Sequence, residues 1–173
     1  MKVQIVNYDP TWPEQYERER DAIAAILQDE LVASFHIGST SVPGLNAKPI
    51  IDILLVVEQI DRLDAWTASF EALGYEVMGE FGIAGRRFFR KGATDRTHHV
   101  HAFQYDNVTD IERHVAFRDF LRQHPDKRIE YGTLKAQLVA QHSNDREAYI
   151  AGKNDFVKEI EREALKWKWR TRA

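Results

Sequence analysis

One carboxylate interrupts an otherwise hydrophobic run, at Asp52 within residues 50–57. Alternation of side chains along a β-strand would give this run two apolar faces. The faces comprise Ile51, Ile53, Leu55 and Val57, and Ile50, Leu54 and Val56. A strand that is apolar on both faces is typical of the middle of a sheet. Because a buried carboxylate without a partner is very costly, we expect Asp52 to meet a metal ion, a cation or strong hydrogen-bond donors.

A glycine and a serine, Gly38 and Ser39, follow a short predicted strand over residues 34–37. Backbone N–H groups and a hydroxyl exposed at such a turn suit a phosphate group. Residues 40–51 are enough to loop back and pair the strand with the Asp52 run. Because Asp52 needs a partner, we predict that the Gly38-Ser39 turn and Asp52 face the same cavity.

Two histidines lie two positions apart in the predicted strand over residues 97–103. His99 and His101 share one face of that strand, and His98 points to the other. With Asp52, the pair resembles a two-histidine, one-carboxylate metal site. We therefore expect a divalent cofactor, magnesium, manganese or zinc, and imidazole ligands shift the preference toward transition metals. The alternative is a histidine–aspartate hydrogen bond that orients an imidazole without metal.

Positive charge is concentrated between residues 84 and 101, where Asp95 is the one acidic side chain. The basic side chains there are Arg86, Arg87, Arg90, Lys91 and Arg96. They could be the solvated edge of a hairpin, which discourages aggregation. They could also bind phosphates, because guanidinium groups match phosphate oxygens. Arg86, Arg87 and also Lys48, just before the Asp52 run, are the candidate phosphate ligands.

The segments around these residues predict further strands over residues 3–8, 75–80 and 86–91. A first helix should begin at Thr11 and carry an apolar stripe as far as Leu31. Capping residues and breakers predict the other helices. These run from Asp61 to Leu73, from Thr109 or Asp110 to Gln123 before Pro125, over residues 128–142, and from Asp145 to Trp169.

Length and composition indicate one globular domain, with 173 residues, 43% hydrophobic and 29% charged. The net charge of −3 argues against nucleic acid as a partner. A basic, aromatic tail over residues 166–172 could still bind a single strand, or one tryptophan could close the core. The sequence has no cysteine, which excludes disulfides and thiol chemistry. No membrane-spanning run or signal pattern is found, so a cytoplasmic protein is expected.

The ordered motifs resemble those of one family. The hallmark is Gly38 to Leu45, reading GSTSVPGL, followed by Ala47 to Ile53, reading AKPIIDI. Similar runs continue over residues 79–89, 98–101, 117–122 and 131–135. This set resembles the GrpB-like family of the nucleotidyltransferase superfamily over nearly the whole chain. The resemblance implies an α+β fold with a mixed, mostly antiparallel sheet, helices and a C-terminal helical segment. It implies a single domain over residues 1–173, with a sheet core over 1–107 and a helical part over 108–173.

Two tyrosine–lysine pairs, each four residues apart, lie on the predicted C-terminal helices. They are Tyr131 with Lys135 and Tyr149 with Lys153. In superfamily members with a C-terminal helical bundle, a helix lysine often reaches the triphosphate, while a tyrosine could stack on the base. The alternative is surface packing of the tyrosine along the lysine stem. We expect one of the two pairs to be functional.

The resemblance also implies a metal-dependent reaction, transfer of a nucleotidyl group from a nucleoside triphosphate to a hydroxyl on a small molecule or protein. The implied residues are Asp52, His99 and His101 for catalysis and metal, and Gly38, Ser39, Lys48, Arg86, Arg87, Tyr131, Lys135 and Lys153 for the nucleotide. Active nucleotidyltransferases usually carry a second carboxylate two residues after the first, and here that position is Leu54. The alternative function is therefore a non-catalytic nucleotide-binding or accessory module.

Overall fold

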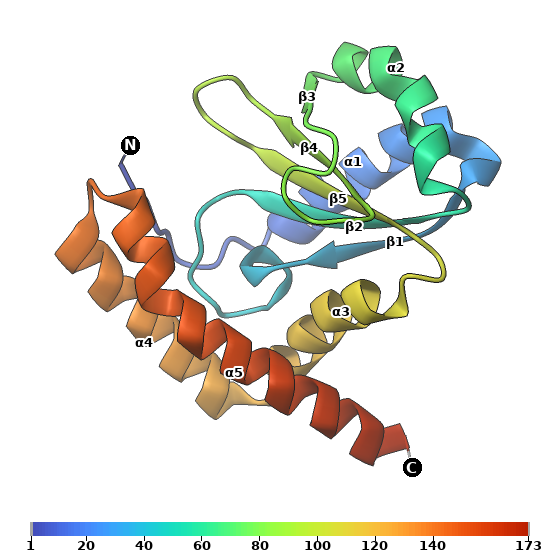
Figure 1. The fold of residues 1–173 in the computed structure, drawn as a ribbon. Helices are drawn as coiled ribbons and strands as arrows, with labels where there is room; N and C mark the ends of the chain where they lie inside the picture. Colours follow the sequence, from blue (N-terminus) through green and yellow to red (C-terminus); the bar gives the residue numbers. More distant parts are fainter. Residues whose placement is uncertain (1, 173) are drawn as a thin grey trace.

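The computed structural model describes residues 2–172, which form a five-stranded sheet with helices on both faces (Figure 1). The strands are β1 (Leu31–Ile37), β2 (Ile51–Val57), β3 (Tyr75–Val77), β4 (Arg86–Lys91) and β5 (His98–Gln104). Their order across the sheet is β1-β2-β5-β4-β3. Only β2 and β5 pair in parallel, and the other three pairings are antiparallel. The predicted α+β fold with a mixed, mostly antiparallel sheet is confirmed.

Helices form a layer on each side of this sheet (Figure 1). They are α1 (Trp12–Leu27), α2 (Thr67–Ala72), α3 (Val108–Gln123), α4 (Pro125–His142) and α5 (Arg146–Arg172). Three short 3₁₀ helices, η1 (Gln28–Glu30), η2 (Ser39–Ser41) and η3 (Ile60–Trp66), join them. Over residues 2–172, no helix combines the length and the apolar character that a bilayer span requires.

Strand β2 is buried on both faces, as its sequence predicts. One core cluster packs α1 and α2 against the face of Ile51, Ile53, Leu55 and Val57. A second cluster packs Leu54 with Ile37, Phe103 and Val115 of α3. Asp52 shares the face of Leu54, because residues two apart on a strand point the same way. The carboxylate therefore lies on the side of the sheet that carries the C-terminal helices.

Two predicted elements differ from those observed. Residues 3–8 form no strand, because Val6 makes an isolated bridge to Ala47 while the Val3 N–H donates to Ser143. Their hydrogen bonds are thus divided between two distant partners. The segment from Asp61 begins as a 3₁₀ helix and becomes α-helical only at Thr67. Asp61 does not cap it, because its carboxylate pairs with Arg87.

The helix starts were predicted less well than the helices themselves. Helix α3 is capped by Asn107, whose side chain accepts from the Asp110 N–H, so the prediction of Thr109 or Asp110 was wrong. Helix α4 begins at Pro125, three residues before the predicted start at residue 128. Proline is suited to the first turn of a helix, because the N–H that it lacks would have no intrahelical partner there. Asp145 accepts from the Ala148 N–H at 3.0 Å, which confirms the predicted cap of α5.

Candidate functional site

The Gly38-Ser39 turn lies directly against Asp52. Ile37, the last residue of β1, pairs with Asp52 of β2. The turn that follows Ile37 therefore lies next to the Asp52 carboxylate. Gly38 has a φ of 72°, and a Cβ added to it would lie 2.7 Å from Asp52 Oδ2. Only a glycine permits both the backbone angle and this close approach. The predicted juxtaposition of turn and carboxylate is present.

Both predicted histidines reach the same carboxylate from β5. The parallel register sets His99 beside Asp52 and His101 beside Leu54, on one face of the sheet. His101 Nε2 lies 3.2 Å from Asp52 Oδ1, and His99 Nδ1 lies 3.7 Å from the same oxygen. His98 lies on the opposite face, where its Nε2 is 4.0 Å from Glu19. One carboxylate oxygen is thus shared by two imidazoles.

Arg86 determines which nitrogen of His101 carries the proton. Arg86 as a whole is 7% exposed, and its Nη1 lies 3.4 Å from His101 Nδ1. An arginine can only donate, so His101 Nδ1 accepts and Nε2 is the protonated nitrogen. The Nε2–H group then donates to Asp52. The other Arg86 donors bind the carbonyls of Glu80 and Phe81, so Arg86 holds the histidine and a loop instead of facing an open phosphate site.

Asp52 is held in its ionised form. Burial raises the pKa of its carboxyl, but the hydrogen bond from His101, the electrostatic attraction of the His101 and His99 rings and the charge of Lys153 together hold the pKa below its usual range. Burial lowers the pKa of His99, even though Asp52 opposes the shift. Near neutral pH the site therefore contains an aspartate anion beside a neutral His99 that can accept a proton.

The three predicted metal ligands do not fit a three-ligand metal centre as they are arranged. Among residues 2–172, no group of three or more histidine and carboxylate side chains is placed to hold a metal ion. The physical reason lies at His101, where the nitrogen that faces Asp52 carries a proton and has no lone pair to offer. Asp52 itself keeps a partly exposed side chain, at 28%. Between His101 and Asp52 the structure contains a histidine–aspartate hydrogen bond of 3.2 Å.

Three lysines from separate parts of the chain gather beside this turn, and we call them the lysine cluster: Lys48, Lys135 and Lys153. Lys135 of α4 is only 2% exposed, and its amine donates to Ser39 Oγ at 2.9 Å and to the Asn46 carbonyl. Lys48 and Lys153 flank the ring of Tyr149, at 4.9 and 5.6 Å from its centroid. Within residues 2–172, none of the three amines forms an ion pair with a carboxylate.

The positive charges of the lysine cluster repel one another. Burial, followed by the charges of Lys153 and Lys48, lowers the pKa of Lys135 to about 7. Burial and the charges of Lys153 and Arg146 lower the pKa of Lys48 to about 8, although Asp52 opposes the shift. The pKa of Lys153 is also lowered by burial, against the pull of Asp52. An anion bound here would relieve this repulsion and recharge the amines.

Other predicted nucleotide ligands either lie away from Asp52 or are buried away from solvent. Arg87 lies on the opposite face of β4 and pairs with Asp64 at 2.9 Å, so it does not join the site. Tyr131 and Tyr149 are 3% and 1% exposed. Burial raises the pKa of Tyr131 to about 12, and a hydrogen bond with Ser39 partly opposes this. Neither tyrosine presents a free ring face to a base.

Phe88 and His114 also contribute rings to the site, and neither was among the predicted site residues. The Phe88 ring lies 5.4 Å from His99 and 5.2 Å from His101, and the His114 ring lies 5.6 Å from His101. The alternation of β4 carried a signal for Phe88, since residues 86, 88 and 90 must share one face. The helical spacing of His114, Arg118 and Arg122 allowed either a solvated face or a contact with phosphate or acceptor, but it did not place His114 of α3 beside His101.

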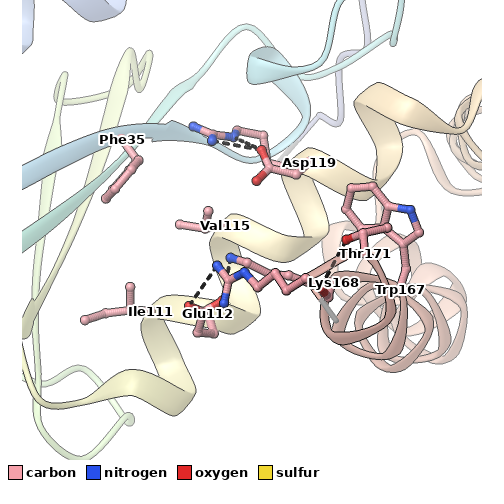
Figure 2. Close-up of a pocket in the computed structure, with 10 residues that line it drawn as sticks. Phe35, Ile111, Glu112, Val115, Asp119, Trp167, Lys168 and Thr171 are labelled. Atoms are coloured by element: carbon pink, nitrogen blue, oxygen red, sulfur yellow. Dashed lines mark hydrogen bonds and ion pairs between the residues drawn. The ribbon is translucent and has the colours of Figure 1, made fainter.

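Two hollows in the surface lie outside this site. One, of about 480 Å³, lies between β1, α3 and the end of α5, with Phe35, Ile111 and Val115 on its apolar side (Figure 2). Its charged groups are already paired, Arg118 with Asp119 and Lys168 with Glu112. The other, of about 540 Å³, lies between the N-terminal segment and α4. Neither is lined by Asp52, by the two histidines or by the lysine cluster.

Replacing Gly38 by alanine should destabilise the protein and displace Asp52. The backbone at φ 72° and ψ −172° is nearly exclusive to glycine, and forcing it on another residue costs about 1–3 kcal/mol. The clash with Asp52 Oδ2 adds to that cost. Gly79→Ala is a matched control, because Gly79 has a φ of 62° with nothing within 4 Å of the added Cβ. Urea unfolding should show the larger loss for Gly38→Ala, and equal losses would contradict the close contact.

Comparison with known proteins now identifies the family. The family model described as GrpB protein matches residues 2–163. UPF0157 protein YqkA of Bacillus subtilis is 45% identical over 167 residues, covering 96% of this chain, which spans 48% of the length of that relative. UPF0157 protein PA4798 of Pseudomonas aeruginosa is 39% identical, covering 95% of this chain and 68% of the relative. The crystal structure of conserved protein GrpB from Enterococcus faecalis superposes with a TM-score of 0.94 at 50% identity, covering 96% of this chain and 99% of that one. This chain therefore belongs to the GrpB family.

Proposed function

We propose that this protein binds a nucleoside triphosphate and transfers its nucleotidyl group to a hydroxyl acceptor. The observation that carries the proposal is the lysine cluster, three amines that form no ion pair with a carboxylate of residues 2–172. Lys135 binds Ser39, and Lys48 and Lys153 lie near enough to Asp52 for their charges to act on one another. Burying such amines together is unfavourable unless an anion joins them. A triphosphate has the charge to do so, with its β and γ groups at the amines and its α group toward Asp52.

The chemistry follows from the charges of the site. The acceptor oxygen forms a bond to the α-phosphorus, the bond from that phosphorus to the bridging oxygen breaks, and pyrophosphate leaves with the electron pair. Neutral His99 takes the proton of the acceptor hydroxyl. The lysine cluster stabilises the negative charge that develops on the departing pyrophosphate. The acceptor would be a hydroxyl on a small molecule or on a protein.

Asp52 is the residue that would hold a divalent metal ion brought in with the triphosphate. Magnesium is commonly bound by one or two carboxylates together with substrate phosphates, so a single carboxylate is sufficient, and manganese or zinc could replace it. Such an ion would neutralise charge on the phosphoryl group. His101 acts by orienting Asp52 through its Nε2–H group, and Arg86 keeps His101 in that tautomer.

The second candidate function is a nucleotide-binding module without catalysis. Leu54 favours it, because this buried leucine occupies the strand position where active nucleotidyltransferases usually place a second carboxylate. The two functions differ in turnover. Incubation with each nucleoside triphosphate, magnesium or manganese, and candidate acceptors should release pyrophosphate from an enzyme. Saturable binding measured by calorimetry without any pyrophosphate would support the module, and absence of binding would reject both.

Binding of a triphosphate at pH 8 should take up as much as about one proton. In the free protein the pKa of Lys135 is about 7, so its amine is mostly neutral at pH 8. A bound anion favours the charged amine and raises that pKa, which draws a proton from the buffer. Calorimetry in HEPES and in Tris should therefore give different apparent enthalpies. Identical enthalpies in the two buffers, despite clear binding, would mean that the phosphates do not lie near Lys135.

A further inference from the structure

Phe81 is an exposed aromatic residue with a strained backbone. It lies in the loop between β3 and β4 and is 52% exposed. Its φ is 47°, a left-handed conformation that is uncommon for any residue other than glycine and is unfavourable for an aromatic one. The loop also has glycines with positive φ at positions 79, 82 and 85. An aromatic side chain that is both strained and half exposed is a candidate for a ligand contact.

Several contacts hold Phe81 in this conformation. Arg86 donates to the Phe81 carbonyl at 2.9 Å and to the Glu80 carbonyl at 3.2 Å. The Phe81 ring stacks on Phe88, with centroids 5.3 Å apart and planes at 14°. The guanidinium of Arg90 lies 5.5 Å from the Phe81 centroid. Phe88 and Arg90 project from the same face of β4, so they meet the ring from the side of the sheet.

This aromatic pair continues directly into the candidate site. Phe88 touches both histidines, and both histidines reach Asp52. Arg86 binds the Phe81 carbonyl and also His101, so one side chain positions both the loop and the histidine that orients Asp52. Lys153 acts on Asp52 by its charge. These contacts link the exposed ring, through Phe88 and the two histidines, to Asp52, on which the lysine cluster acts by its charge.

We propose that Phe81 is the platform on which the base of the nucleoside triphosphate stacks. The proposal rests on the proposed function above and assigns the base end of the same ligand. Tyr131 and Tyr149 are buried and cannot serve, whereas Phe81 combines exposure with contact to the site. A ligand with its triphosphate at the lysine cluster and its α-phosphate at Asp52 would extend its base toward Phe81. Stacking on an aromatic ring tolerates different bases, because every base has a π face.

Calorimetry with two ligands tests this assignment separately from the phosphate site. Wild-type protein with magnesium should bind ATP about tenfold more tightly than inorganic tripolyphosphate, the size expected of one base stack. Phe81→Gly should reduce ATP affinity to the tripolyphosphate level and leave tripolyphosphate affinity unchanged. Phe81→Tyr, which keeps the ring, should retain the preference for ATP. Glycine suits a φ of 47°, so the thermal midpoint of Phe81→Gly should stay close to that of the wild type.

The remaining outcomes distinguish failure of the base platform from failure of the phosphate site. Wild-type protein that binds both ligands equally, or a Phe81→Gly variant that keeps the preference for ATP, would overturn the base platform while the phosphate site stands. Failure of both ligands to bind would overturn the proposed function, and the platform with it. Phe81→Trp gives a second readout, because its fluorescence should be quenched by ATP and not by tripolyphosphate. Equal quenching by both ligands would again contradict stacking.

Discussion

Replacement of Lys135 by methionine is expected to make the protein more stable and less able to bind a triphosphate. Lys135 is 2% exposed, and below its pKa of about 7 the folded protein must hold a charge on its amine. Methionine fills similar space without that charge. Removing the charge gains more than is lost with the hydrogen bonds to Ser39 and Asn46, and we expect a net gain of about 1–3 kcal/mol at pH 6. Triphosphate affinity should fall about tenfold or more.

The lowered pKa of Lys135 also predicts how the free energy of unfolding changes with pH. The pKa of Lys135 is about 7 in the folded protein, whereas its ordinary value is 10.5. Between these values the unfolded chain binds more protons than the folded one, so the contribution of Lys135 to stability rises with pH. The penalty of the buried charge is complete below pH 7 and is relieved as the pH approaches 10.5. Urea unfolding at pH 6 and pH 9 should show this rise for wild type and a smaller one for Lys135→Met.

Lys158→Met is the matched control, because Lys158 is an exposed lysine on α5. It should change stability by less than about 0.5 kcal/mol and leave triphosphate affinity unaffected. A Lys135→Met variant that is less stable than wild type at pH 6 would mean that the native state holds the amine more favourably than its burial implies. A variant that binds triphosphate normally would remove Lys135 from the proposed site.

Replacement of Asp52 by asparagine should separate phosphate binding from catalysis. Asparagine has nearly the same shape, and its carbonyl can still accept from His101 Nε2, so the fold should be retained. Loss of the carboxylate removes the group that would hold a metal ion, whose charge stabilisation is worth several kcal/mol, so turnover should fall by about 100-fold or more. Triphosphate binding in the presence of a chelator should be equal or tighter, because a negative charge beside Lys153 has been removed.

Pyrophosphate release and calorimetry check the two parts independently. Asp155→Asn, at an exposed position on α5, is the control and should change neither. Full turnover by Asp52→Asn would exclude Asp52 from the chemistry. Weaker binding in chelator would show that the phosphates do not lie near this carboxylate. Wild-type protein that binds nucleotide without releasing pyrophosphate would direct attention to the non-catalytic module.

Local periodicity was sufficient for the strands that carry the reactive groups. Side chains alternate strictly along a strand, so the sequence alone indicated that β2 is buried on both faces around Asp52. The same rule set His99 and His101 on one face and His98 on the other. The predicted end of β1 at Gly38 followed from a turn signal that needs no distant contact. Segments whose hydrogen bonds depend on distant partners, such as residues 3–8, were predicted wrongly.

The sequence by itself thus determined the family, the sheet and the identity of the carboxylate and its two histidines. Tertiary structure alone decided which cations and rings are available to a ligand. Arg86 and Arg87 are neighbours in the sequence, but they project from opposite faces of β4. Arg86 therefore meets His101, and Arg87 meets Asp64. The packing of α4 against α5 buried both tyrosines and brought Lys135 and Lys153 together. These outcomes depend on contacts between residues far apart in the chain, whose geometry no local pattern contains.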